Sequence, residues 1–196
     1  MKIFRFFSNI DLSSTLENMP FQVLPDTALL IQKRPFFIPD FTEDCKVQFC
    51  YAVRINRLGR SIHEKFAHRY YDASAITLGV HFVACDLLAS LQASGKPWDV
   101  AVGFDNAVAV SEHKATDFLN ADEATLQIQE VPLKSAVNRD LPRLIDQQIA
   151  RISAYYTLKQ GDILLFPVEV DAQQVEIDNH ISLFLDSEEV LSFNVK

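Results

Sequence analysis

The side chains that could act as nucleophiles or bind soft metal ions are few and widely spaced in this chain. The thiols are Cys45, Cys50 and Cys85. They are odd in number and include no Cys-x-x-Cys pair, which favours reduced cysteines over a disulfide framework. Because the thiolate is the reactive form, any of these cysteines needs a base or positively charged surroundings before it can do chemistry.

Five histidines could supply such a base. His63 and His68 stand beside a lysine and an arginine on an expected helix, so we expect both to face solvent. His81 differs, because it lies near the end of an expected strand, where the chain enters a turn before Asp86. We therefore single out His81 as the histidine on which a site could be built.

The common catalytic signatures are missing from the sequence. It has no G-x-G-x-x-G, P-loop, G-x-S-x-G, H-E-x-x-H or EF-hand pattern. Any site must therefore be found from the elements that position isolated residues.

Composition narrows the class of protein. The 196 residues are 48% hydrophobic and 22% charged, which predicts a globular chain with a substantial core. The net charge is −8, and the 18 basic residues are scattered, so we expect no nucleic-acid-binding face. No apolar run reaches the roughly 18 residues of a membrane span, and no secretory leader is recognisable, so we expect no membrane partner and a cytoplasmic location.

One expected strand orients the candidate residues. Between Lys46 and Asn56, apolar residues at odd positions alternate with a second set at even positions. A period of two places the two sets on opposite faces of a strand. Gln48 and Cys50 should therefore share the face opposite the core.

The remaining pattern indicates a strand-dominated α+β fold. Further strands are expected at 2–7, 27–32, 36–38, 75–84, 163–166, 174–177, 180–185 and 190–195. Short helices are expected at 62–71, with Ser61 and Glu64 as a capping box, near 86–88, and from Asp140 onward with Pro142 in the first turn. The chain lacks the βαβ alternation of doubly wound folds and has no linker, so we expect a single domain over residues 1–196.

Several short blocks, in the right order, resemble the fumarylacetoacetate hydrolase family. The blocks are Leu24-Pro25-Asp26-Thr27-Ala28, Phe36-Phe37-Ile38-Pro39-Asp40, Phe66-Ala67-His68-Arg69-Tyr70-Tyr71-Asp72, Gly95-Lys96-Pro97-Trp98, Gly103-Phe104-Asp105 and Tyr155-Tyr156-Thr157-Leu158-Lys159 with Gly161-Asp162. The resemblance is dense over residues 20–112 and looser beyond. It implies a mixed β-roll with a few short helices, usually a homodimer, whose members use Mg²⁺, Mn²⁺ or Ca²⁺ to hydrolyse, isomerise or decarboxylate small oxo acids.

The same resemblance gives the metal to a Glu-x-Glu pair and a later Asp. These three positions match Gln48, Cys50 and His81. An amide, a thiol and an imidazole remove up to three negative charges from a site for a hard divalent cation, which prefers charged oxygen ligands. We therefore expect these to be vestigial metal-site positions, with no catalytic residue, no metal and no cofactor retained.

Other functional positions depart from the family pattern as well. The resemblance places Asn9 in the family's N-terminal motif and Ser13 where that motif has its general-base histidine. Family lysines correspond to Leu24 and Val102. We take Asn9, Ser13, Asp86 and Val102 as pocket candidates.

Two other kinds of site stay open. Cys50 and His81 are good zinc ligands, with Cys85, which matches a family arginine, as a third. Alternatively, Cys50 and His81 could form a nucleophilic pair with Asp86 as its orienting carboxylate.

The favoured interpretation is a catalytically impaired paralogue that keeps a pocket for a small organic acid and a dimer surface. That surface would serve a homodimer or a heteromer with an active family member. The alternative is an active hydrolase, isomerase or decarboxylase of small oxo acids that uses a rebuilt or softer-metal site, with zinc or with Mg²⁺ or Mn²⁺.

Overall fold

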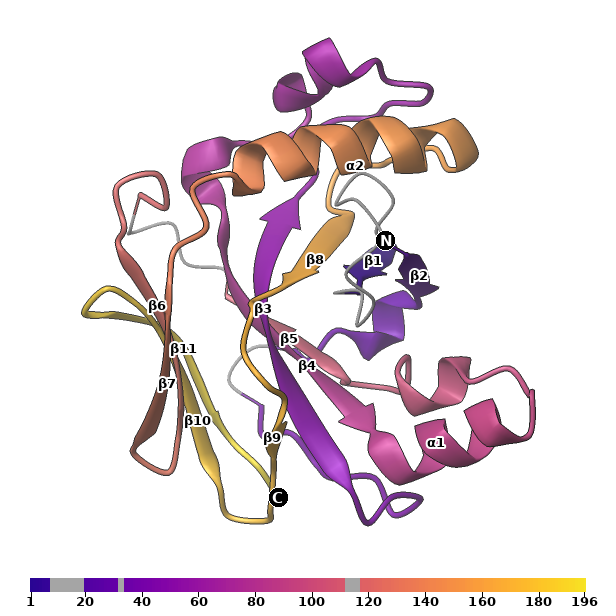
Figure 1. Ribbon diagram of the computed structural model, residues 1–196, viewed down its shortest axis with the longest axis vertical. Coiled ribbons are helices and arrows are strands. Elements are labelled where there is room, and N and C mark those ends of the chain that lie inside the picture. Colours follow the sequence, from indigo (N-terminus) through magenta and orange to yellow (C-terminus); the bar gives the residue numbers. More distant parts are fainter. Residues whose placement is uncertain (8–19, 32–33, 112–116) are drawn as a thin grey trace.

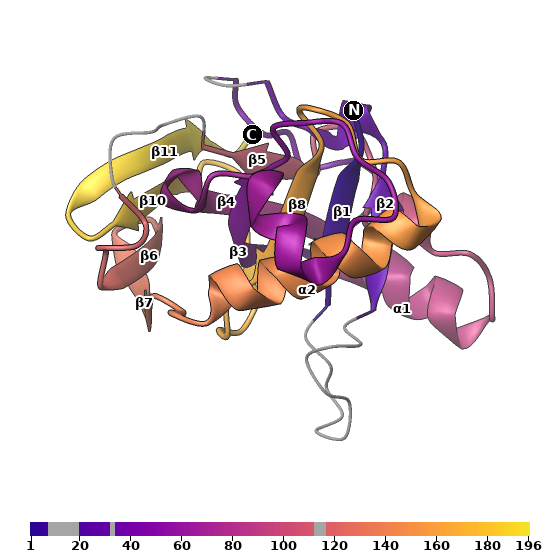
Figure 2. The same ribbon diagram turned by 90° about the horizontal axis from the view of Figure 1, so that it is seen from above.

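Two β-sheets and two α-helices form the molecule in the computed structural model, which describes residues 1–7, 20–31, 34–111 and 117–196. The larger, seven-stranded sheet has the order β2-β1-β8-β3-β4-β5, with β9 paired to one end of β3. The smaller sheet has the order β11-β10-β6-β7. Figures 1 and 2 show the smaller sheet at one side of the larger one, with β2 and α1 at the opposite side. The fold is thus the strand-dominated α+β class expected from the sequence.

The bounds of the elements are as follows. The strands are β1 Ile3–Phe6, β2 Phe21–Leu24, β3 Cys45–Arg54, β4 Thr77–Ala84, β5 Val108–Val110, β6 Glu123–Ile128, β7 Val131–Ala136, β8 Ile163–Pro167, β9 Gln173–Gln174, β10 His180–Leu185 and β11 Glu188–Asn194. The helices are α1 Cys85–Ala93 and α2 Leu141–Tyr155, with short 3-10 turns η2 Asp26–Ala28, η3 Glu64–Arg69, η4 Ala73–Ala75 and η5 Asp99–Ala101. Within the described residues, no helix is long and apolar enough to cross a membrane.

The large sheet has a hydrophobic core on each face. The main core holds the odd-numbered residues of β3, such as Phe49 and Val53, together with residues of the small sheet and of α2. The second core holds Cys50 and Ala52 of β3, Leu165 of β8 and the apolar residues around η5. The alternation predicted for β3 is therefore present, but hydrophobic residues cover both faces of the strand.

Helix α2 crosses one end of the large sheet (Figure 1). Its apolar stripe of Ile145, Ile149 and Ile152 is fully buried, as its spacing predicts. Pro142 lies in the first turn, where its missing N–H costs no helical bond, whereas the Asp140 side chain makes no capping hydrogen bond.

Several segments differ from expectation; the strand expected at 36–38, for example, has only a single bridge from Phe36 to Val195. The predicted helix at 62–71 is only the 3-10 turn η3, and its cap is His63, whose side chain accepts a bond from the Lys65 N–H, instead of Ser61. Phe66 is consequently 41% exposed and does not continue a helical stripe. The predicted strand at 27–32 overlaps η2, and its described residues make only a single bridge, from Leu29 to Val108.

The hairpin β6–β7 has no counterpart among the expected strands. Its turn residues Gln129 and Glu130 have φ angles of 46° and 67°, the left-handed values of a tight hairpin turn. Asn and Gly normally mark such turns, so the sequence carries no turn signal here. Strand β7 is an edge strand of its sheet and contains Pro132, a residue that is confined to edges and strand starts.

A buried carboxylate ties β1 to the turn before β8. Asp162 is fully buried and accepts hydrogen bonds from the backbone N–H groups of Lys2 at 2.8 Å and Lys159 at 2.9 Å. The Lys2 ammonium lies 2.7 Å from the same carboxylate. Because β1 and β8 pair in parallel, these bonds fix the register in which β1 joins the sheet.

We predict that Asp162→Ala destabilises the fold by about 3 kcal/mol, because it leaves two backbone donors and one ammonium without their acceptor. Chemical denaturation measures this change. The matched control is Asp26→Ala, whose carboxylate is 62% exposed and lies 4.0 Å from the N-terminus, and which should cost less than about 1 kcal/mol. Equal losses in the two variants would contradict this role for Asp162.

Candidate functional site

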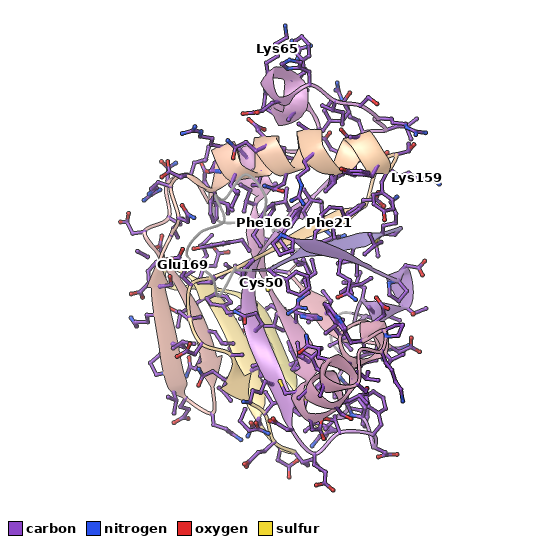
Figure 3. All side chains as sticks on the ribbon, turned by 45° about the vertical axis from the view of Figure 1, so that its right-hand side comes forward. Phe21, Cys50, Lys65, Lys159, Phe166 and Glu169 are labelled. Atoms are coloured by element: carbon purple, nitrogen blue, oxygen red, sulfur yellow. The ribbon has the colours of Figure 1, made fainter. Side chains whose placement is uncertain are left out.

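The candidate residues of β3 and β4 are brought together by the pairing of these two strands. The antiparallel register sets Gln48 opposite His81 and Cys50 opposite Gly79. Residues directly opposite one another point to the same face of a sheet, so all three candidate side chains share one face. Figure 3 shows Cys50 midway along β3. Val47, Phe49 and Tyr51 lie in the main core on the other face, as the alternation predicts.

This shared face is more enclosed than we expected. His81 is fully buried, Cys50 is 2% exposed, and only Gln48 is partly exposed. Cys50 packs in the second core with Ala52 and Val110. The expectation that Cys50 faces away from any core is therefore corrected: a second core covers its thiol, and the sequence pattern of β3 alone cannot show that covering.

His81 is held as a neutral imidazole. Its Nε2 lies 2.7 Å from the carbonyl oxygen of Val102, and because a carbonyl only accepts hydrogen bonds, Nε2 carries the proton. Burial, reinforced by the positive charge of Arg5, lowers the pKa of His81 well below its usual value. Nδ1 is then an unprotonated acceptor, and it is buried with no hydrogen-bond partner among the described residues.

Cys50 is held as a neutral thiol. Burial raises its pKa to about 12, and the nearby Arg5 charge only partly opposes this. Its Sγ lies 3.6 Å from the carbonyl oxygen of Gln48, a weak contact within the strand. A nucleophilic pair of Cys50 with His81 therefore has no support in the geometry, since the Cys50 thiol is not activated and makes no hydrogen bond to the His81 side chain.

The Gln48 amide faces the segment that follows β8. Its Nε2 lies 3.3 Å from the carbonyl oxygen of Val170 and 3.5 Å from that of Val168. These long bonds use the amide as a donor, a role that a carboxylate could not fill.

Arg5 is a member of this face that we did not anticipate. In the sheet, Arg5 of β1 pairs with Leu165 of β8, which pairs with Ala52 of β3, so its side chain lies on the second-core face. The Arg5 guanidinium is close enough to act on the pKa values of Cys50 and His81. The signal that could have found it is a charged residue at an apolar position within the short strand Ile3–Phe6.

Arg5 is half-buried, and the described residues around it supply little countercharge. Burial lowers its pKa to about 10, which still leaves the guanidinium protonated at neutral pH. Its Cζ lies 4.3 Å from the ring centroid of Phe7, which in turn contacts Trp98 edge-on at 5.8 Å. Nη1 is buried and has no hydrogen-bond partner within the described part of the chain.

Gln22 of β2 pairs directly with Arg5 and lies on the same face. Its Nε2 donates a 2.6 Å hydrogen bond to the exposed carboxylate of Asp99. Its Oε1 is buried without a partner among the described residues. Arg5, Gln22 and His81 thus each present one unpartnered polar atom on this face of the sheet.

The other predicted pocket residues have different surroundings. Asp86 accepts hydrogen bonds from the Thr42 hydroxyl and the backbone of Glu43, which lowers its pKa and ties α1 to the turn before β3. It therefore does not orient His81. Val102 is buried in the second core and contributes only its carbonyl group to the site. Asn9 and Ser13 lie outside the described residues.

Comparisons with known proteins agree with this fold. No family model matches the chain. The oxaloacetate tautomerase YcgM of Escherichia coli is 27% identical over 152 residues, and an oxaloacetate tautomerase, mitochondrial FAHD1 of Arabidopsis thaliana, is 26% identical over 148. The alignments cover 73% and 74% of this chain, and the chain spans 66% of the length of each relative.

A solved structure resembles the whole chain. The fumarylpyruvate hydrolase of Pseudomonas aeruginosa, determined in complex with Mn²⁺ and pyruvate, superimposes with a TM-score of 0.79 at 15% identity. The match covers 100% of this chain and 89% of that one. At this identity the likeness concerns the fold.

We predict that the cysteines differ in reactivity. In the native protein at pH 8, a disulfide reagent should label Cys85 first, because Cys85 is partly exposed whereas Cys45 and Cys50 are buried with pKa values raised to about 12. Cys45 and Cys50 should react only after unfolding. Mass spectrometry locates the label, and Cys85→Ser should abolish native-state labelling. Rapid native labelling of Cys50 would show an activated thiol instead.

Proposed function

Since the chain belongs to the fumarylacetoacetate hydrolase family and is distantly related to oxaloacetate tautomerases, we propose that it is a member that binds a small organic acid without the family's metal-dependent turnover. The observation that carries this proposal is the chemistry of Gln48, Cys50 and His81. At the positions that the family resemblance gives to three carboxylates, they form a face without negative charge.

These residues do not fit a hard divalent cation. Mg²⁺ and Mn²⁺ prefer charged oxygen ligands, whereas this face presents an amide that points its N–H groups at carbonyls, a neutral thiol and a neutral imidazole. The positive charge of Arg5, which already acts on Cys50 and His81, would repel a second cation.

Zinc fits little better. Zinc binding requires a deprotonated thiol, and the burial that raises the pKa of Cys50 adds to the cost of removing its proton. The described residues contain no group of three or more His, Cys, Asp or Glu side chains arranged to hold a metal ion. Cys85 therefore does not complete a ligand set with Cys50 and His81 in this arrangement.

We also propose that residues 1–196 act as one domain and that the protein assembles as a homodimer or with an active family member. The main core joins residues of both sheets and of α2, which supports a single domain. Assembly is supported by large apolar side chains that remain exposed, such as Phe37 at 66% and Phe41 at 52%, because aromatic residues are enriched at interfaces.

We predict that the purified protein does not bind Mn²⁺ stoichiometrically and does not accelerate oxaloacetate tautomerisation with or without Mg²⁺ or Mn²⁺. Calorimetry measures Mn²⁺ binding, and the ultraviolet absorbance of the enol follows tautomerisation. Acylpyruvate hydrolysis and oxaloacetate decarboxylation are assayed in parallel. The combined variant Gln48→Glu, Cys50→Glu and His81→Asp should gain Mn²⁺ binding but little rate.

The control for that variant is Gln174→Glu, which adds a carboxylate at an exposed position of β9 and should not gain Mn²⁺ binding. Circular dichroism checks that each variant is folded. Tight Mn²⁺ binding together with turnover by the unmodified protein would overturn the proposal and support the alternative of an active enzyme on small oxo acids.

A separate prediction concerns assembly. Light scattering at micromolar concentration should give a mass of twice the 22.2 kDa of one chain for a homodimer. A mass near 22 kDa would contradict self-association.

A further inference from the structure

The Arg5 side chain is half-buried with its Nη1 fully enclosed, and the described residues supply no counter-ion for its positive charge. We propose that Arg5 binds the carboxylate of a small hydroxy acid or of the enol form of an oxo acid, so that this chain takes its ligand through a guanidinium in place of a metal ion. This inference rests on the proposed function and names the group that recognises the acid.

The nearby acidic side chains are already engaged elsewhere. Asp99 is exposed and accepts a bond from Gln22, Asp162 is paired with Lys2, and Asp86 is bound to Thr42. None of these carboxylates acts on the pKa of Arg5.

The neighbouring titratable side chains do not supply the countercharge either. The groups whose charge would act on Arg5 are the thiols of Cys50 and Cys85, and burial raises the pKa of both, which keeps them neutral. His81 is neutral as well, and Gln22 beside Arg5 is uncharged. A half-buried charge without a partner loses part of its hydration uncompensated, so we take a ligand anion as the source of the missing negative charge.

A carboxylate matches the shape of the group. A guanidinium is planar and presents its N–H donors as a fork, which a carboxylate can accept in two parallel bonds. The free Nη1 of Arg5 supplies at least one such donor. Phe7, stacked on the guanidinium at 4.3 Å, keeps water away from one of its faces.

The hydroxyl group is inferred from the other unpartnered atoms. The Oε1 of Gln22 and the Nδ1 of His81 are both buried acceptors on the same face of the sheet, and both lack a donor among the described residues. A ligand that carries only a carboxylate would satisfy neither. A small acid with an O–H group can give its carboxylate to Arg5 and its proton to one of these acceptors.

Trp98 provides a direct readout. It is the single tryptophan of the chain and contacts Phe7, which lies against Arg5. Ligand binding at Arg5 should therefore change Trp98 fluorescence. The probes are lactate, which has a carboxylate and a hydroxyl, propionate, which lacks the hydroxyl, and lactamide, which lacks the charge.

We expect saturable binding of lactate, weaker binding of propionate and none of lactamide. Arg5→Met should weaken lactate binding by about 10- to 100-fold, the loss expected for hydrogen bonds to a charged group. Arg5→Lys keeps the positive charge but lacks the planar fork of N–H donors. Its affinity for lactate should therefore lie between those of the wild type and of Arg5→Met. Arg34→Met, which removes an exposed arginine elsewhere, should leave binding unchanged.

A thermal-unfolding readout keeps the test independent of fluorescence. Lactate should raise the melting temperature of the wild type and of Arg34→Met but not that of Arg5→Met. If Arg5→Met does not fold, the inference is tested by comparing lactate binding by Arg5→Lys with that by the wild type. No saturable carboxylate binding by the wild type, or equal binding by wild type and Arg5 variants, would overturn the inference.

The two proposals fail separately. Metal-dependent turnover with Arg5-dependent lactate binding would overturn the proposed function and the replacement of the metal ion, while Arg5 would stand as the carboxylate-binding group. Absence of both turnover and carboxylate binding would overturn the role of Arg5 and the small-acid part of the proposed function, while the missing metal chemistry would stand.

Discussion

The pairing of β3 with β4 is the constraint on which the site depends. Its register sets Gln48 opposite His81 at the centre of the large sheet, and β8 on the other side of β3 brings Arg5 of β1 to the same face. A shift of one residue in β3 would turn Cys50 into the main core and expose Phe49 to the second. The buried Asp162, which anchors β1 beside β8, therefore also determines where the Arg5 charge lies.

The electrostatics of this face follow from what the register brings together. Neutral groups at three adjacent positions remove the attraction for a divalent cation, and a guanidinium nearby supplies a positive charge that is fixed to the chain. In a half-buried position without a counter-ion, such a charge either destabilises the fold or binds an anion. The unpartnered atoms of Gln22 and His81 on the same face of the sheet are easier to understand as parts of a binding group, because a packed core alone gains nothing from buried polar atoms that lack partners.

Much of the frame could be predicted from sequence, because strands β3, β4 and β10 and helix α2 carry strong local patterns. The alternation in β3 correctly placed Gln48 and Cys50 on the same face. The burial of Cys50 and His81 could not be predicted, since it depends on η5 and the residues around it, from a distant part of the chain, packing over that face. Arg5 was missed for the same reason: its neighbours in space are supplied by β2, β4 and β8, and its own strand gives only an arginine among apolar residues.

The most direct test of a guanidinium acting in place of a metal is a crystal structure of the protein soaked with Mn²⁺ and lactate, recorded with anomalous data. We expect no anomalous peak between Gln48, Cys50 and His81, and electron density for a carboxylate within hydrogen-bond distance of the Arg5 guanidinium. An anomalous peak at these three residues, with Arg5 turned away from the bound acid, would contradict it.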